Sequence, residues 1–333
     1  MEKMLTEENF ILAERKLSQN KRKDKLARYI SQHAEYYGPK LLKEVKSGYS
    51  WHTPRCTTIK DSYKGKERNL KIPCKKDQAV QIAWLNIATP YIERKNYYYN
   101  CGSIPGAGQT RCTKALKKWL KDPKAKYGAV LDIRKFYDTC PHDLVRRGLY
   151  RIFKDKEFVE FAMSFTASMS DTNIGLAIGY PVSHWLANIA LMQLDHEIKR
   201  LYPDVHYVRY MDDMALVSSN KRHIRKCVYF IKGSIESSGM TLKKWSVFKI
   251  KDRGLTFLSF RFFNGYTLMT KKLMVRISRR MHKSVHKMNK HIAMGLVSYF
   301  GILSQCNSYN FRVRHVYPYT SKPHLTTIIS QMS

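Results

Sequence analysis

Acidic residues are scarce in this sequence and absent from its last part. The 333 residues include 60 Lys and Arg but only 26 Asp and Glu, which gives a formal net charge of +34. Residues 253–333 contain 13 Lys and Arg and not one Asp or Glu. A chain with this excess repels itself unless polyanions neutralise it. The composition therefore favours a phosphate-rich partner such as nucleic acid over a merely soluble basic surface or an anionic membrane patch.

Paired cysteines and long apolar runs are also missing. The seven cysteines are scattered without a C-x-x-C pair, which argues against a zinc knuckle and against a disulfide framework. No apolar run approaches the length of a membrane span, and the N-terminus lacks the apolar core of a signal peptide. With 44% hydrophobic residues the chain can nevertheless build a core. We therefore expect a globular protein of the cytoplasm, with no membrane partner.

Hydrophobic periodicity predicts an α+β fold. Residues 1–54 form a basic, mostly helical extension, and residues 55–73 alternate as expected for a β-hairpin. Between residues 127 and 263 the predicted order is strand, helix, strand, strand, helix, strand, which is the order of the ferredoxin-like split motif. Within this region the pattern predicts helices over residues 142–169 and, after Pro181, over residues 183–201, and strands near residues 242–250 and 256–263. The remaining residues, from 265 to 333, are predicted to be helical and basic.

A basic stripe is predicted in this last segment. The pattern favours one long helix over residues 273–293, with an apolar face and a separate row of cations. Contacts with phosphates and a solvated basic face are equally good explanations of this row. Its members are Arg276, Arg280, Lys283, Lys287 and Lys290.

Three carboxylates stand at the ends of apolar strands. Asp132 closes the strand predicted over residues 127–133, and Asp212 and Asp213 occupy the bend of a tight hairpin. Phosphoryl transfer requires two divalent ions held close together, and Mg²⁺ prefers oxygen ligands. A lone Asp–Asp pair is usually a solvated turn, but its apolar flanks make this one a candidate site for two Mg²⁺ ions.

The same residues carry a family resemblance. YMDD at residues 210–213 resembles the Y-x-D-D box of reverse transcriptases, and DIRKFYD at 132–138 resembles their motif A. Further matches follow in the family's order from about residue 65 to residue 300, with two departures, at Gln78 and Ser259, from the usual Arg and Gly. The resemblance implies a right-hand polymerase with fingers at 55–125, a palm at 126–264 and a helical thumb at 265–333.

The resemblance also implies roles for single residues. It implies an RNA-directed DNA polymerase, a nucleotidyltransferase that binds template RNA, the cDNA product and dNTPs. Tyr137 would be the aromatic gate that rejects a ribose 2′-hydroxyl, and Lys66 and Arg68 would grip the incoming triphosphate. The two Mg²⁺ ions would be held by Asp132, Asp212, Asp213 and the carbonyl group of Ile133.

Residues 178–183 (IGYPVS) bear on the subgroup. Retroviral and group II intron enzymes have Gln where this chain has Ile178, whereas the reverse transcriptases of diversity-generating retroelements have an aliphatic residue followed by Gly, here Gly179. His184 departs from the Gln of that pattern. The match at this position implies that Ile178 and Gly179 contact the incoming nucleotide. The similarity to the retroelement enzymes implies error-prone copying and a small basic accessory protein. A retron or antiphage-defence enzyme with a cognate non-coding RNA remains an alternative, and so does a non-catalytic RNA-binding scaffold; a bacterial or phage origin is expected.

Overall fold

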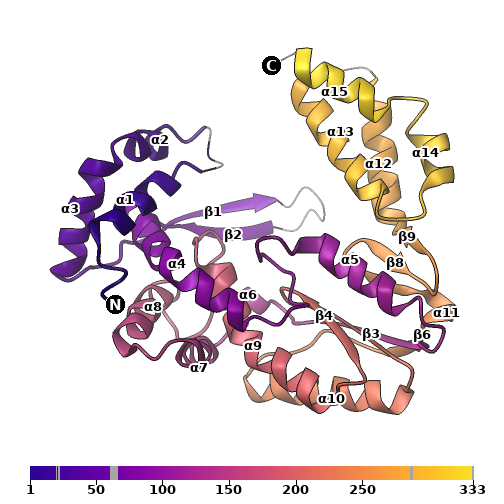
Figure 1. The fold of residues 1–333 in the computed structure, drawn as a ribbon, viewed down its shortest axis with the longest axis horizontal. Helices are drawn as coiled ribbons and strands as arrows, with labels where there is room; N and C mark the ends of the chain where they lie inside the picture. The colour runs from indigo at the N-terminus through magenta and orange to yellow at the C-terminus, as the bar shows by residue number, and fades with distance from the viewer. Residues whose placement is uncertain (20, 22, 61–66, 286–287, 332–333) are drawn as a thin grey trace. The chain divides into compact units, whose positions relative to one another are not determined.

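The computed structural model describes residues 1–19, 21, 23–60, 67–285 and 288–331, which form two compact units (Figure 1). Unit 1 contains residues 1–104, 133–201 and 231–243, and unit 2 contains residues 105–132, 202–230 and 244–333. Because the units interleave along the chain, the limits of fingers, palm and thumb stay predictions. Within the described ranges, no helix is both long and apolar enough to span a bilayer.

Three helices, α1 to α3, form the N-terminal part of unit 1, and α4 follows them after the β1–β2 hairpin. The side chain of Thr6 caps the first of them by accepting a hydrogen bond from the Asn9 backbone N–H. Helix α1 packs on α3 and on α4 (Figure 1). Phe10 and Ala13 of α1 are buried. The elements are α1 (Glu7–Lys16), α2 (Lys25–Gln32), α3 (Ala34–Lys46) and α4 (Lys75–Lys95).

Glu14 of α1 is also buried, and it makes the stability of the fold depend on pH. Burial raises the pKa of its carboxyl from 4.5 to about 7. Between these values the unfolded chain has released the proton and the folded chain retains it, so stability falls as pH rises through this window. We expect Glu14→Met to raise the free energy of unfolding by about 2–3 kcal/mol at pH 8 and by much less at pH 4. Urea denaturation at both pH values measures the difference, and Glu8→Met, on the exposed side of the same helix, is the control; equal effects at both pH values would contradict this assignment.

The rest of unit 1 combines a hairpin with further helices. The predicted helical stretch 142–169 is divided in two, because Asp155 caps a new helix by accepting a hydrogen bond from the Phe158 N–H at 3.0 Å. Helices α7 and α9 cross closely at Gly148, where an added Cβ would lie 2.6 Å from the Ile189 Cγ2. The elements are β1 (Arg55–Lys60), β2 (Glu67–Ile72), α6 (Phe136–Thr139), α7 (His142–Ile152), α8 (Lys156–Ala167) and α9 (Ser183–Leu201).

A four-stranded antiparallel sheet forms the centre of unit 2. Its strand order, β4-β5-β3-β6, is the one that the ferredoxin-like split motif produces, so that prediction is confirmed. Helix α5 packs beside β4. The elements are α5 (Gly108–Trp119), β3 (Tyr127–Asp132), β4 (His206–Tyr210), β5 (Asp213–Ser218), β6 (Val247–Lys249) and α11 (Ile250–Arg253), with α10 (Lys221–Ser237) running from unit 2 into unit 1.

Two predictions in the C-terminal part are wrong. The single strand predicted over residues 256–263 is a hairpin, which turns at Leu258 and Ser259, both with positive φ. The single helix predicted over residues 273–293 is interrupted, because Asn289 has an extended backbone and its side chain caps a new helix at the Ile292 N–H. The elements are β7 (Leu255–Phe257), β8 (Phe260–Phe262), β9 (Thr267–Met269), α12 (Lys271–Ser284), α13 (Lys290–Leu303), α14 (Tyr309–His315) and α15 (Lys322–Gln331).

Candidate active site

Asp132 and Asp213 face each other across two neighbouring strands of unit 2. In the register of β3 and β5 they are direct partners. Directly opposite residues of an antiparallel pair project to the same face, with Cβ atoms about 5 Å apart. Both side chains are only half-buried, so each keeps some exposed surface at this end of the sheet. The donor chemistry fits Mg²⁺, which is bound by carboxylate oxygens and retains water ligands.

Asp212 lies in the turn that joins β4 to β5. Since Tyr210 pairs with Asp213, the hairpin loop consists of two residues only, Met211 and Asp212. Such a turn requires a positive φ, and Met211 adopts one of 57°. A non-glycine residue in this region costs about 1–2 kcal/mol, which the surrounding structure has to offset. The turn thus places Asp212 directly before Asp213, in the hairpin bend that the sequence predicts, and its part in a metal site stays a prediction.

Arg209 supports this turn from the opposite face of the sheet, a role that the sequence reading missed. The side chain is fully buried, and its Nη1 donates a hydrogen bond to the Met211 carbonyl at 2.9 Å. Its register partner is Met214, so it projects away from the face that carries Asp213. In the sequence Arg209 appears only as one charged residue in a short strand, three residues before Asp212.

Tyr137 and Ile178 belong to one backbone network in unit 1. The Tyr137 carbonyl accepts a hydrogen bond from the Leu176 N–H at 2.7 Å, and the Ile178 carbonyl accepts one from the Lys71 N–H at 2.9 Å. Strand β2 is thereby joined to the segment that carries Ile178 and Gly179. Tyr137 and Ile178 are both half-buried.

Gly179 is required by this close approach of β2. Its φ is +120°, and a Cβ at this position would lie 2.5 Å from the Lys71 carbonyl oxygen. No other residue fits here without displacing the strand. The sequence predicts a nucleotide contact at Gly179; the structure adds a steric reason for glycine, and the nucleotide contact remains a prediction.

The residues predicted to bind the triphosphate and to offer a carbonyl ligand lie on β2, before it and after β3. Arg68 lies exposed on β2, whereas Lys66 is outside the described residues. Ile133 is fully buried and forms a bridge with Leu242. The roles assigned to these residues stay predictions.

The predicted basic stripe is not one row on one helix. Arg276 and Arg280 lie on α12 and approach α13: the Arg276 guanidinium is 5.8 Å from the centroid of the Tyr299 ring, and the Arg280 Nη2 is 4.0 Å from where a Cβ of Gly295 would be. Lys283 is exposed near the end of α12. Lys290 begins α13, and Lys287 lies outside the described residues. The break at Asn289 thus removes the single row, and nucleic-acid binding by these cations stays a prediction.

Comparison with known families identifies the family of this chain. The sequence profile of the reverse transcriptase (RNA-dependent DNA polymerase) family matches residues 59–262, which include all three carboxylates. This chain belongs to the reverse transcriptase family. It is also similar to Protein YkfC of Escherichia coli (strain K12), with 23% identity over 267 residues that cover 66% of this chain and 70% of that protein.

Solved telomerase structures share the fold of this reverse transcriptase. The apo telomerase of Candida tropicalis matches with a TM-score of 0.55 and 14% identity, over 91% of this chain and 64% of that chain. The telomerase of Candida albicans in complex with a fragment of telomeric RNA matches with a TM-score of 0.52 and 11% identity, over 91% of this chain and 66% of that chain. The fold is therefore the α+β right-hand polymerase fold. The chain spans less than two thirds of the length of these telomerase chains.

Proposed function

We propose that this protein is an active RNA-directed DNA polymerase that copies an RNA template into cDNA. The observation that carries the proposal is the pairing of Asp132 with Asp213, with Asp212 in the adjoining two-residue turn. Three carboxylates on rigid strand ends suit a pair of Mg²⁺ ions, to which Asp132, Asp212, Asp213 and the Ile133 carbonyl would contribute ligands. When bound, such ions activate the primer 3′-hydroxyl and stabilise the leaving pyrophosphate.

Primer extension on a defined RNA template tests this proposal. The purified chain, given a DNA primer, dNTPs and Mg²⁺, is expected to extend the primer, and EDTA is expected to stop the reaction. If the chain binds the RNA template but extends neither a DNA primer nor an RNA primer, the result would instead support a non-catalytic scaffold. The intact carboxylate set argues against that alternative.

Tyr137 is proposed to select the sugar of the incoming nucleotide. It follows Asp132 by five residues, as the aromatic gate of the family does, and its backbone is fixed by the hydrogen bond to Leu176. We expect Tyr137→Val to increase ribonucleotide incorporation by roughly tenfold or more, because one avoided steric clash is worth about 1–3 kcal/mol. Competition between dNTPs and rNTPs on one template measures the ratio, with Tyr137→Phe as the control that keeps the ring. Unchanged selection in Tyr137→Val would refute the gate.

Within the family, we propose an error-prone enzyme of a diversity-generating retroelement, with a small basic accessory protein as partner. The support is Ile178, an aliphatic side chain at the position where other branches have a Gln amide. The Lys71 N–H holds the Ile178 backbone through a hydrogen bond, so a substitution at this position changes the side chain without changing that backbone contact. A retron or antiphage-defence role, with a cognate non-coding RNA, is the second candidate, because His184 departs from the Gln of the retroelement pattern.

Ile178→Gln tests the subgroup through fidelity. One lost hydrogen bond is worth about 1 kcal/mol, or roughly fivefold in discrimination. Wild type should therefore misincorporate readily, and Ile178→Gln should lower the error rate by about that factor, most clearly opposite template adenine. Deep sequencing of cDNA made by both forms provides the measurement, with Ile178→Leu as the control that preserves an aliphatic side chain. Accurate copying by wild type would favour the retron or defence role.

A further inference from the structure

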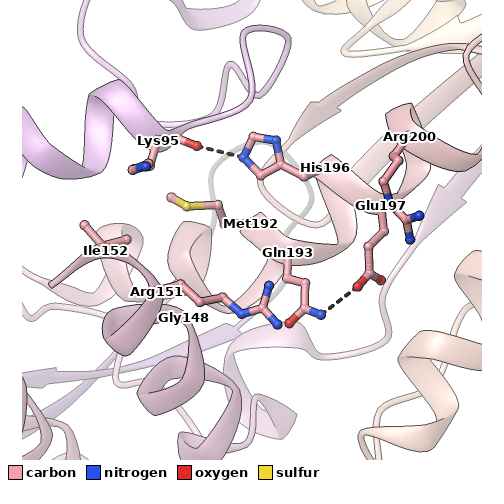
Figure 2. Close-up of a pocket in the computed structure, with 9 residues that line it drawn as sticks. All are labelled: Lys95, Gly148, Arg151, Ile152, Met192, Gln193, His196, Glu197 and Arg200. Carbon is pink, nitrogen blue, oxygen red and sulfur yellow. Dashed lines mark hydrogen bonds between the residues drawn. The ribbon is translucent and has the colours of Figure 1, made fainter. Parts of the chain in front are cut away.

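A hollow lies where three helices of unit 1 end together, apart from every residue assigned so far. Helices α7 and α9 touch at Gly148, and residues from the C-terminal parts of α4, α7 and α9 line the hollow (Figure 2). The cavity has a volume of about 440 Å³. Its apolar side is formed by Gly148, Ile152 and Met192. Cavities of roughly 300–1,000 Å³ bind small organic groups, and a nucleoside falls within this class.

Hydrogen bonds fix the walls of this hollow. The His196 Nε2 donates to the Lys95 carbonyl at 2.8 Å, which ties the last residue of α4 to α9 (Figure 2). The Gln193 side chain donates to the Glu197 carboxylate at 2.6 Å, so the one acid that lines the hollow already has a partner. The cavity is therefore built by fixed backbone and side-chain contacts.

Three cations from three different helices surround the mouth. Lys95, Arg151 and Arg200 are exposed and line the same hollow. In the part of the chain that the structure describes, none of them forms an ion pair. Each stands at or near a helix C-terminus, where a cation offsets the helix dipole. The helix dipole can account for a cation at each helix end. It does not account for the position of all three cations around one cavity with an apolar wall.

We infer that this hollow binds one nucleotide of a single-stranded RNA, outside the polymerase site. The base would lie against Met192 and Ile152, and the flanking phosphates would be bound by the cations at the mouth. One guanidinium group can donate two parallel hydrogen bonds to two oxygens of a phosphate, and Arg151 and Arg200 each carry such a group. RNA is favoured over an acidic peptide because a flat base suits a cavity of about 440 Å³ with an apolar wall, whereas the net charge of +34 attracts both kinds of polyanion. The inference requires RNA binding only and does not depend on polymerase activity.

A matched pair of charge variants tests the inference. The full-length variant Lys95→Gln/Arg151→Gln/Arg200→Gln removes the three cations, and Lys40→Gln/Lys43→Gln/Lys46→Gln removes three exposed lysines of α3 as a control. Both are titrated with a fluorescein-labelled 12-nucleotide RNA across a salt series, without primer or dNTPs. We expect the first variant to bind about tenfold more weakly, with a salt slope smaller by about 2, because each phosphate contact contributes about 0.7. An equal loss in both variants would overturn the inference, whatever the outcome of primer extension.

Crosslinking identifies the place of contact and its chemistry. An RNA that contains 4-thiouridine is irradiated on the wild-type protein, and adducts are expected on Met192 or His196. Loss of these adducts in the first variant, with retention in the α3 control, supports the inference. Adducts confined to other peptides would overturn it. Complete loss of the crosslink when a free nucleoside monophosphate is added at the concentration of the RNA would assign the hollow to a small nucleotide. Loss of the crosslink on addition of polyglutamate would assign it to an acidic protein. Either result would overturn the inference.

Discussion

Replacing Asp213 with Asn should reduce primer extension by roughly 10³-fold or more, and Asp132→Asn should do the same. Each change removes one charge of the row that the β3–β5 register creates. Metal-centred stabilisation of the transition state is worth several kcal/mol, and each 1.36 kcal/mol corresponds to a factor of ten in rate. The initial rate of extension on an RNA template at saturating dNTP measures the loss.

The two carboxylates should act as one unit. Because both project from the same face to the same ions, the double variant is expected to be little worse than either single variant. RNA affinity, measured by fluorescence anisotropy, should change less than twofold, since one or two charges are small against +34. Asp138→Asn is the matched control: this exposed acid lies near Asp132 in sequence, and we assign it a structural role. Extension retained in the double variant would refute the two-metal assignment.

The parts of the fold that local pattern encodes were predictable. Helix α9 was predicted over Ser183–Leu201 and has those bounds, because Pro181 precedes it and apolar residues recur along it. The hairpin of β4 and β5 was predictable because two apolar strands flank a short polar bend. From these strands alone the positions of Asp132, Asp212 and Asp213 could be placed at one end of a sheet.

Features that depend on contacts between distant segments, or on a local cap that interrupts a periodic pattern, were not predictable. The cap at Asn289 competes with a continuous apolar periodicity, and periodicity alone favours the unbroken helix. The need for glycine at 179 arises from the Lys71 carbonyl, more than 100 residues earlier in the chain. The burial of Arg209 likewise follows from the packing of the sheet, and its own strand resembles any half-exposed strand in sequence.

Arg209 is the residue whose removal should have the next largest effect. It carries a charge, is fully buried, and donates a hydrogen bond to the Met211 carbonyl at 2.9 Å. Met211 has the strained positive φ on which the two-residue turn depends. A hydrogen bond from a charged donor contributes about 1.5–3 kcal/mol, which is enough to offset a strain of about 1–2 kcal/mol. Arg209 is thus a positioning residue, which acts on Asp212 through the turn.

We expect Arg209→Met to lower kcat about 100-fold, because displacing reacting groups by about 1 Å can cost that much. The Kd for primer–template should stay within threefold, and the Mg²⁺ concentration for half-maximal rate should rise, since the carboxylates would no longer be held in place. Arg209→Lys, which keeps a charge without the planar fork, should recover part of kcat. Arg222→Met, an exposed Arg of the same unit, controls for loss of a cation. Arg209→Met could instead lower the melting temperature and leave kcat and the Mg²⁺ requirement of the folded protein unchanged. That result would show that Arg209 stabilises the sheet without positioning the turn.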